Sequence, residues 1–252
     1  MSLGEMRIIP ISGIREVNPG YDLAPLIGEA AQVQGTPLED GDILVITQKV
    51  VSKAEGRLLD LRSVEPSPLA LEFARAYDKD ARQVEVVLRE SRRIVRMDRG
   101  IIISETRHGF VCANAGVDAS NVGKDEMVTL LPADPDASAS AIRARIEENL
   151  AIELAVIISD TFGRPWREGV TNVAIGAAGM LPLHDYTGQR DPAGYILRVT
   201  VMAVADELAS AAELVMGKLK RVPAAIVRGY EYLKGTGSAK DLVRPPQMDL
   251  FR

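Results

Sequence analysis

The chain has 252 residues; 46% of them are hydrophobic and 26% are charged, and the formal net charge is −5. This composition is ordinary for a globular protein, and the slight acidic excess argues against binding of duplex nucleic acid through a basic surface. One cysteine, Cys112, and two histidines, His108 and His184, exclude an internal disulfide bond and a zinc site built from several Cys and His ligands. Any metal ion is therefore expected to be held mainly by oxygen atoms, as Mg²⁺, Mn²⁺ and Ca²⁺ are.

The sequence carries no sign of membrane insertion or export. No apolar run approaches the roughly 20 residues of a transmembrane helix, and the segment up to Met6 lacks the apolar core of a secretory signal. With a single cysteine, this favours a cytoplasmic protein that has neither a membrane nor a nucleic acid as its partner. Residues 1–5 are interpreted as a vector remnant. We expect residues 7–252 to form one unit, with two interleaved subdomains as the alternative.

The predicted elements follow one another in mixed order. Short β-branched runs between turn residues predict strands, and capping residues before apolar periodic segments predict helices. In chain order these are strand 7–11, helix 22–33, strand 43–47, helices 66–76 and 79–91, strands 94–97, 101–104, 110–113 and 127–130, helix 138–150, strands 154–159 and 195–203, helix 206–217 and strand 223–227. Neither a GxGxxG motif nor a P-loop occurs. The sequence therefore predicts an α+β fold with mixed sheets and about five helices.

The segment 114–121 is the first candidate for chemistry, because polar residues stand among small ones directly after a predicted strand. A carboxylate such as Asp118, presented from a turn, is a natural ligand for a hard cation. The alternative is an Asx-turn, in which Asp118 or Asn121 bonds its own backbone.

The segment 159–169 follows the most apolar predicted strand and is the second candidate. Asp160 and the hydroxyl of Thr161 could share a metal ion at the carboxyl end of this buried strand. Arg164 and Arg167 could then hold an anionic substrate by bidentate pairing. The alternative is a helix N-cap followed by solvated arginines.

The third candidate, 48–57, follows the predicted strand 43–47. Lys49 and Lys53 could lie close to phosphate groups and stabilise charge that develops during transfer. The alternative is a solvated amphipathic segment. Cys112 lies in an apolar predicted strand and is interpreted as a core residue rather than a nucleophile.

These segments, taken in order and with their spacing, resemble one family. The matching runs are 40–45 (DGDILV), 51–57 (VSKAEGR), 114–121 (NAGVDASN), 159–164 (SDTFGR), 174–179 (AIGAAG), 205–209 (ADELA) and 227–229 (VRG). On this ordered set the chain is similar to the coenzyme F420-0:L-glutamate ligase family, also called γ-glutamyl ligases. The resemblance covers residues from about 7 to 230.

The resemblance implies an unusual α+β ligase fold and an intertwined homodimer. It also implies a GTP-dependent carbon–nitrogen ligase that adds L-glutamate to a phospholactate-linked deazaflavin coenzyme and extends the tail through γ-linkages. The expected intermediate is an acyl phosphate, and GDP and phosphate are released. GTP is then the cosubstrate and Mg²⁺ or Mn²⁺ the divalent cation, with a K⁺ requirement left open.

The resemblance also implies roles for particular positions. Asp118 and Asp160 would bind one divalent cation and Thr161 a second, while Lys53 and Asp160 would carry the catalysis. Nucleotide contacts would come from Ile14, Arg15, Glu16, Gln48, Lys49, Lys53, Asn121, Met216, Gly217 and Lys218. Arg164 and Arg167 remain candidates for substrate binding.

The chain departs from the family pattern in one place that bears on the metal ligands. Lys218-Leu-Lys-Arg221 stands where archaeal members often carry an acidic, glycine-rich stretch. The tail 241–251 resembles the junction of two-domain bacterial members, which continue into a nitroreductase-like domain. The chain is thus either a single-domain ligase or the N-terminal part of such a protein. The alternatives for function are a ligase for another carboxylate acceptor, or a nucleotide- or deazaflavin-binding module without turnover.

Overall fold

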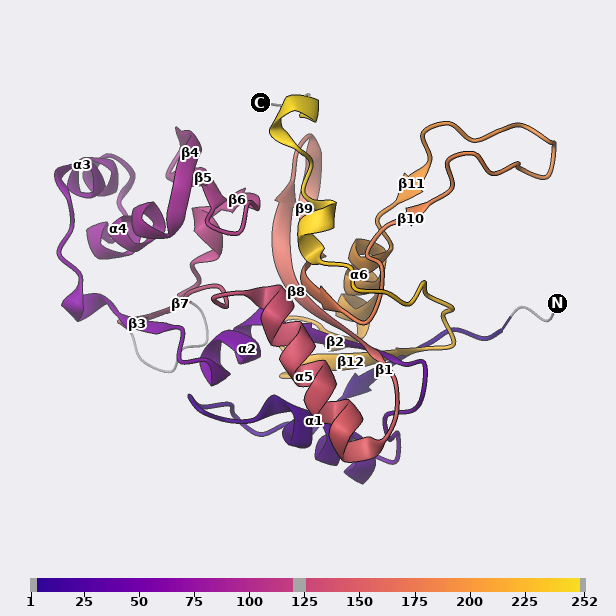
Figure 1. The fold of residues 1–252 in the computed structure, drawn as a ribbon. Helices are drawn as coiled ribbons and strands as arrows, with labels where there is room; N and C mark the ends of the chain where they lie inside the picture. Colours follow the sequence, from indigo (N-terminus) through magenta and orange to yellow (C-terminus); the bar gives the residue numbers. More distant parts are fainter. Residues whose placement is uncertain (1–3, 120–125, 250–252) are drawn as a thin grey trace.

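The computed structural model describes residues 4–119 and 126–249, and its centre is a mixed five-stranded sheet (Figure 1). The strand order is β1 (Arg7–Ile11), β12 (Ala224–Arg228), β2 (Ile43–Thr47), β8 (Ala155–Arg164) and β9 (Arg167–Ala178). Strands β2 and β8 are parallel, and the other neighbouring pairs are antiparallel. Because β2 and β8 run in the same direction, their carboxyl ends meet at one edge of the sheet.

Helices cover both faces of this sheet. Helices α1 (Leu23–Val33) and α5 (Pro135–Leu150) pack on one face, and α6 (Val204–Met216) packs on the other. Alternate residues of β2 belong to the two cores: Leu44 and Ile46 face α1 and α5, and their neighbours face α6. A strand that is buried on both faces needs a continuous apolar run, which is what 43–47 supplies.

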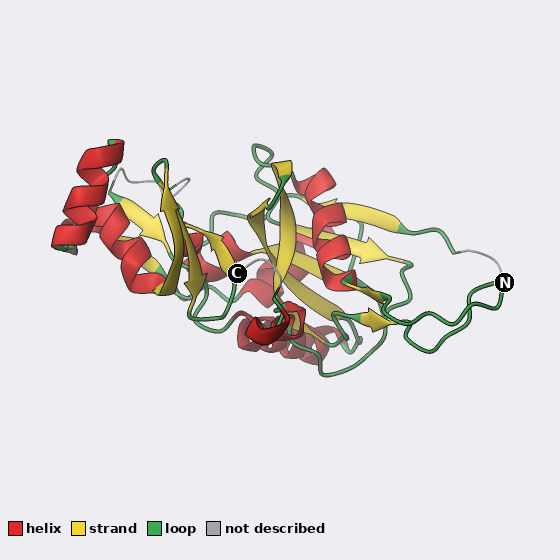
Figure 2. Cartoon of the chain, turned by 90° about the horizontal axis from the view of Figure 1, so that it is seen from above, coloured by secondary structure: helices red, strands yellow, loops and turns green. Residues whose placement is uncertain are grey.

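A smaller lobe, described for residues 58–119 and 126–130, is inserted between the short helix α2 (Gln48–Ala54) and α5, and it lies to one side of the sheet (Figure 2). The lobe contains β3 (Leu58–Asp60) paired with β7 (Met127–Thr129), helices α3 (Pro68–Tyr77) and α4 (Ala81–Glu90), and a sheet of β4 (Ser91–Asp98), β5 (Ile101–Thr106) and β6 (Val111–Ala113). Phe73, Val86 and Ile102 belong to its own apolar core.

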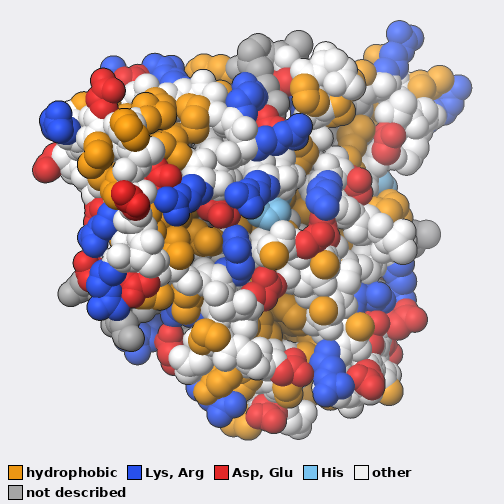
Figure 3. Space-filling view, turned by 60° about the vertical axis from the view of Figure 1, so that its left-hand side comes forward, with side chains coloured by type: hydrophobic (Ala, Val, Ile, Leu, Met, Phe, Trp, Pro, Cys, Tyr) orange, Lys and Arg blue, Asp and Glu red, His pale blue; other side chains and the backbone are white. Residues whose placement is uncertain are grey.

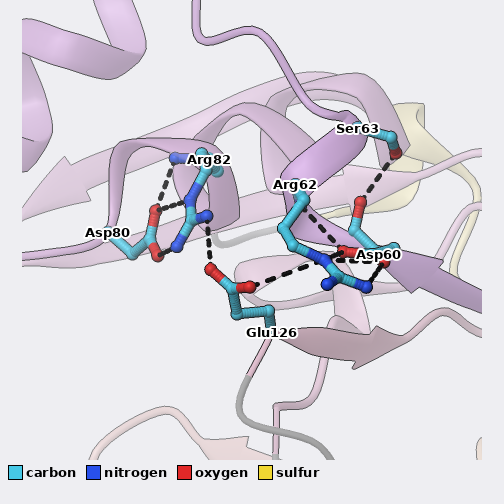
Figure 4. A network of polar contacts seen from close by, with 6 residues as sticks. All are labelled: Asp60, Arg62, Ser63, Asp80, Arg82 and Glu126. Carbon is cyan, nitrogen blue, oxygen red and sulfur yellow. Dashed lines mark hydrogen bonds and ion pairs between the residues drawn. The ribbon is translucent and has the colours of Figure 1, made fainter.

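Charged side chains of the lobe pair with one another. Glu126 lies between Arg82, at 2.9 Å, and Arg62, at 3.5 Å, and each arginine also pairs with a neighbouring aspartate (Figure 4). This network joins the start of β7 to α4. Figure 3 shows Lys and Arg side chains gathered on this side of the molecule with Asp and Glu side chains among them. On β4, Arg92 and Arg93 both contact Glu105.

The remaining elements are short. They are the 3₁₀ helices η1 (Leu61–Ser63), η2 (Asn114–Gly116), η3 (Ala239–Leu242) and η4 (Pro246–Met248), and the strand pair β10 (His184–Asp185) and β11 (Val201–Met202). The chain between β10 and β11 extends away from the body as an arm (Figure 1). Within the described ranges, no helix is both long and apolar enough to cross a membrane.

The predicted α+β class with mixed sheets and about five helices is confirmed, and two local expectations are wrong. The five predicted helices are present among the described residues, together with the short helix α2, which the sequence pattern does not predict. The predicted strand 195–203 reduces to Val201–Met202. The arm around it makes only local backbone contacts, so its alternating pattern has no sheet to face. Strand β8 does not end at Ser159 but continues to Arg164, paired with β9.

Candidate active site

A cavity of about 1030 Å³ opens at the carboxyl ends of β2 and β8. Its walls come from the loop after β1, the start of α2, the segment around η2, the end of β8 and the residues after α6. Of the residues singled out from the sequence, it is lined by Ile14, Arg15, Glu16, Gln48, Lys49, Lys53, Asp118, Asp160, Thr161, Gly217 and Lys218. Segments separated by up to about 200 residues in the sequence are thus brought to one place.

Asp160 and Thr161 lie in β8 just beyond the point where its pairing with β2 ends. Thr47, the last residue of β2, pairs with Ser159, and β8 then runs on alone beside β9. The register with β9 shifts between Ile158 and Ser159, and such a bulge bends and twists a strand. The helix N-cap interpretation of Asp160 is therefore wrong. This residue lies within β8, at a point where β8 is paired with β9 but no longer with β2.

Asp118 is held by backbone pairing to the lobe. Its N–H and C=O both bond Thr129, at 3.0 and 2.8 Å. The preceding Asn114 and Ala115 both have φ of 52°, a left-handed conformation that is uncommon for residues other than glycine and that often marks functional segments. The Asp118 carboxylate lies 2.6 Å from the ammonium of Lys49 on α2. This ion pair links the lobe to α2, and both of its residues line the cavity.

Asp160 is a carboxylate in an unfavourable place for its charge. Burial raises its pKa to about 6, and the negative charge of Asp118 acts in the same direction. The N–H of Thr161 and the ammonium groups of Lys218 and Lys49 act against this shift. Two carboxylates that disfavour each other's charge are a natural place for a cation.

The side of the cavity formed by α2 and the loop after β1 is polar. The Lys53 ammonium contacts the Glu16 carboxylate at 2.5 Å; the lysine side chain is 12% exposed and the glutamate 76%. The guanidinium of Arg15 lies 5.0 Å from the centre of the Tyr21 ring. Gln48 is buried and accepts a hydrogen bond from the Ser52 hydroxyl within α2. The lysines of α2 are thus partly buried against acids rather than lying on a solvated face.

The part of the cavity lined by β8, β9 and the end of α6 contains a closed ring of four side chains, two of which the sequence analysis did not single out. Lys218 donates to the Thr161 hydroxyl at 2.5 Å, and this hydroxyl donates to Asn172 Oδ1 at 2.8 Å. Asn172 Nδ2 donates to Glu213 at 3.1 Å, and Glu213 lies 3.3 Å from Lys218. Asn172 is a buried amide in an otherwise small and apolar run, which is the one signal that could have indicated it.

Several predicted residues lie elsewhere. Met216 is fully buried in the core beneath α6, next to Gly217, which caps that helix as predicted. Arg164 and Arg167 are exposed at the far end of the β8–β9 hairpin and do not line the cavity. Asn121 lies outside the described residues.

Cys112 lies close enough to Asp160 to feel its charge, but it is buried. Burial, together with the charge of Asp160, raises the pKa of the Cys112 thiol to about 12. The thiol therefore stays neutral and is a poor nucleophile. This agrees with its interpretation as a core residue.

The donor set fits a hard cation at one position. Asp118 and Asp160 offer carboxylate oxygens whose mutual repulsion a cation would relieve. Across residues 4–119 and 126–249, no cluster of three or more His, Cys, Asp or Glu side chains is arranged to hold a metal ion. A cation here would thus need further oxygen ligands from substrate or water, as Mg²⁺ commonly does. Asp118 also contacts an ammonium group, that of Lys49, but a carboxylate carries a full negative charge and has a second oxygen to offer. At Thr161 the fit is poorer, because a single neutral hydroxyl oxygen already contacts the ammonium group of Lys218.

A polar cavity at the carboxyl ends of parallel strands, with lysines facing paired carboxylates, is typical of enzymes that bind anionic small molecules. The chain belongs to the F420-0:Gamma-glutamyl ligase family, whose model matches residues 13–229. It is 50% identical over 248 residues to the coenzyme F420:L-glutamate ligase of Methanothermobacter thermautotrophicus, covering 97% of this chain and 98% of that protein. The protein of the same name from Methanopyrus kandleri is 49% identical over 255 residues, with 99% of each chain covered.

Proposed function

We propose that this chain ligates L-glutamate to the deazaflavin coenzyme F420-0, extends the glutamate tail through γ-linkages, and uses GTP to activate the acceptor carboxylate. Membership of the family and the names of the relatives support the ligation. The cavity supports the rest of the proposal, because it gathers Asp118, Asp160 and three lysines from separate motifs around one space.

The chemistry explains why such a set is needed. A carboxylate resists attack by an amine because its leaving group would be oxide. In the proposed reaction the acceptor carboxylate attacks the γ-phosphorus of GTP, which forms an acyl phosphate and releases GDP. The glutamate amine then attacks the acyl carbon, and phosphate leaves. Both steps gather negative charge on phosphate oxygens, so stabilisation of that charge and alignment of the reactants are what the protein must supply.

In this proposal, the lysines that line the cavity stabilise phosphate charge and the two aspartates hold a cation. Lys49 and Lys53 line the cavity from α2, and Lys218 lines it from the segment after α6, so that a triphosphate in this cavity would meet ammonium groups from two separate elements. Asp118 and Asp160 would hold Mg²⁺ or Mn²⁺, which when bound supplies further neutralisation of phosphate charge. The Lys53 ammonium group is held by the Glu16 carboxylate, and both residues line the cavity.

Mass spectrometry tests the proposal directly. The protein is incubated with F420-0, L-glutamate, GTP and Mn²⁺ or Mg²⁺, and mass increments of glutamyl units with release of GDP are expected. GTP hydrolysis without such increments would point instead to a different acceptor carboxylate. Absence of nucleotide turnover with either cation would contradict the proposal and favour a binding module.

Replacement of Lys53 by alanine is expected to raise the KM for GTP by about 10- to 100-fold, the loss typical of one charge-assisted hydrogen bond, with a smaller change in kcat. Its partner Glu16 is mostly exposed, so no buried charge is left behind. Steady-state kinetics with GTP as the varied substrate measure this. Lys79→Ala, which removes an exposed lysine of the lobe, is the matched control. Equal KM values for the two variants would remove Lys53 from the nucleotide site.

A homodimer is also part of the proposal, supported by the arm between β10 and β11. The arm exposes large apolar side chains, among them Tyr195 (61% exposed) and Val199 (89%), on a segment that extends from the body (Figure 1). Several exposed apolar side chains on one segment mark a protein–protein interaction site, whereas a single exposed one such as Val33 does not. Light scattering should give twice the chain mass, and Val199→Asp should shift the protein toward the monomer. Val33→Asp, which changes an equally exposed valine on α1, should not.

A further inference from the structure

The closed ring of side chains on the cavity wall places a positive charge where three oxygen atoms converge. The ammonium nitrogen of Lys218 lies 2.5 Å from Thr161 Oγ1, 3.3 Å from Glu213 Oε1 and 3.5 Å from Asn172 Oδ1. Thr161 and Glu213 line the same cavity as Asp160. The ammonium group, at the end of a side chain that is 57% exposed, thus lies against a carboxylate, an amide oxygen and a hydroxyl.

This arrangement is the one that a hard cation would otherwise use. Carboxylate, amide and hydroxyl oxygens are the preferred ligands of Mg²⁺ and Mn²⁺. The hydroxyl of Thr161 has one proton, which it donates to Asn172, and it accepts from Lys218. A divalent cation on the same hydroxyl oxygen would lie beside the ammonium group, and two like charges at such a distance repel strongly.

Glu213 is also committed to the lysine. Its two carboxylate oxygens contact different partners, with Oε2 accepting from Asn172 and Oε1 facing Lys218. The carboxylate is therefore both neutralised and oriented by this chain's own groups. A second metal ion would have to displace the ammonium group before it could use either Glu213 or Thr161.

We propose that the ammonium group of Lys218 takes the place of a second divalent cation, so that this chain works with a single divalent cation at Asp118 and Asp160. This inference rests on the proposed function, and it replaces the expectation that Thr161 binds a second cation with a different proposal. The positive charge next to Thr161 is then built into the chain and does not depend on the concentration of free metal.

The stoichiometry of bound Mn²⁺ tests the inference without a measurement of turnover. Free Mn²⁺ is followed by electron paramagnetic resonance during titration of the protein with a non-hydrolysable GTP analogue present. We expect about one Mn²⁺ per chain for the wild type. Lys218→Ala should take up about two, because Thr161, Asn172 and Glu213 then offer their oxygens to a metal ion.

Two further variants control for charge and for position. Lys218→Arg keeps a cation against the three oxygens and should stay at about one Mn²⁺ per chain. Lys220→Ala removes an exposed lysine two residues further along, which does not line the cavity, and should also stay at about one.

The outcomes separate this inference from the function on which it rests. Two Mn²⁺ per wild-type chain, or an unchanged single Mn²⁺ in Lys218→Ala, would overturn the inference and leave the proposed function standing. Failure of the wild type to bind either Mn²⁺ or the GTP analogue would overturn the proposed function, and the inference with it.

Discussion

Replacement of Asp160 by asparagine is expected to lower the rate of glutamyl addition by about 1000-fold or more, because the amide retains the shape of the side chain but loses the charge that holds a cation. Asp160 is the only one of the two paired carboxylates that lies on the central sheet, and its strand is fixed by nine residues of pairing with β9. The rate is measured by mass spectrometry as glutamyl units formed per minute at saturating GTP and Mn²⁺.

The fold should survive this change. Because burial raises the pKa of Asp160 to about 6, its ionised form is disfavoured in the folded chain relative to the unfolded one. This unfavourable contribution is present above the folded pKa and is lost as the pH falls below the unfolded pKa. Without added metal, a neutral asparagine should therefore leave the melting temperature at pH 7.5 equal or higher than that of the wild type.

A control variant shows whether the loss of rate is specific to Asp160 or follows from any Asp→Asn change. Asp78 caps α3 in a left-handed conformation that asparagine also adopts readily, and it is exposed on the lobe. Asp78→Asn should change neither the rate nor the melting temperature. Near-normal turnover in Asp160→Asn would remove Asp160 from the proposed metal site.

The parts of the fold that could be predicted from the sequence are those whose pattern is local. The apolar run 43–47 is a strand with the predicted bounds because it is buried on both faces, and Asp22 caps α1 because its side chain accepts from the Ala24 N–H. Helix α2 was missed because seven residues with two adjacent valines have weak helix propensity. Its formation depends on packing against β2 and β8.

The candidate site shows the same division. The acids and lysines could be found from the chemistry of single segments and from the family resemblance, and the cavity brings most of them together. Asn172 and Glu213 could not be found in this way. Asn172 reaches the site because the strand register places it opposite Thr161, and Glu213 reaches it because α6 packs against β9. The family resemblance implies a nucleotide contact for Lys218, and the contacts of this residue with Thr161 and Glu213 can be seen only in the folded chain.

Gly176→Ala is expected to have the largest effect on stability, about 3 kcal/mol of destabilisation. A Cβ at this position of β9 would lie 2.4 Å from the carbonyl oxygen of Pro135 and 2.6 Å from its carbonyl carbon, both in the backbone of the first turn of α5. Backbone cannot rotate aside as a flexible side chain can, so either α5 or β9 must shift. The midpoint of urea unfolding measures the change.

The same substitution at Gly28 provides the control, because there we expect alanine to raise the stability rather than lower it. Gly28 lies in the interior of α1, and a Cβ there would meet nothing within 4 Å. Neither glycine has a left-handed φ, so only the surroundings differ. Gly28→Ala should stabilise the chain by about 1 kcal/mol through helix propensity.

Gly176 lies close enough along β9 to the candidate site that its substitution should also change the rate of glutamyl addition. Gly176 pairs with Ile158, immediately before the bulge that leads β8 to Asp160. A shift of β9 away from α5 should therefore also disturb Asp160, and the rate of glutamyl addition at a temperature where the variant is folded should fall for Gly176→Ala but not for Gly28→Ala. A Gly176→Ala chain as stable as the wild type would show that α5 moves off the sheet freely, and that its close approach to β9 does not fix the geometry of the cavity.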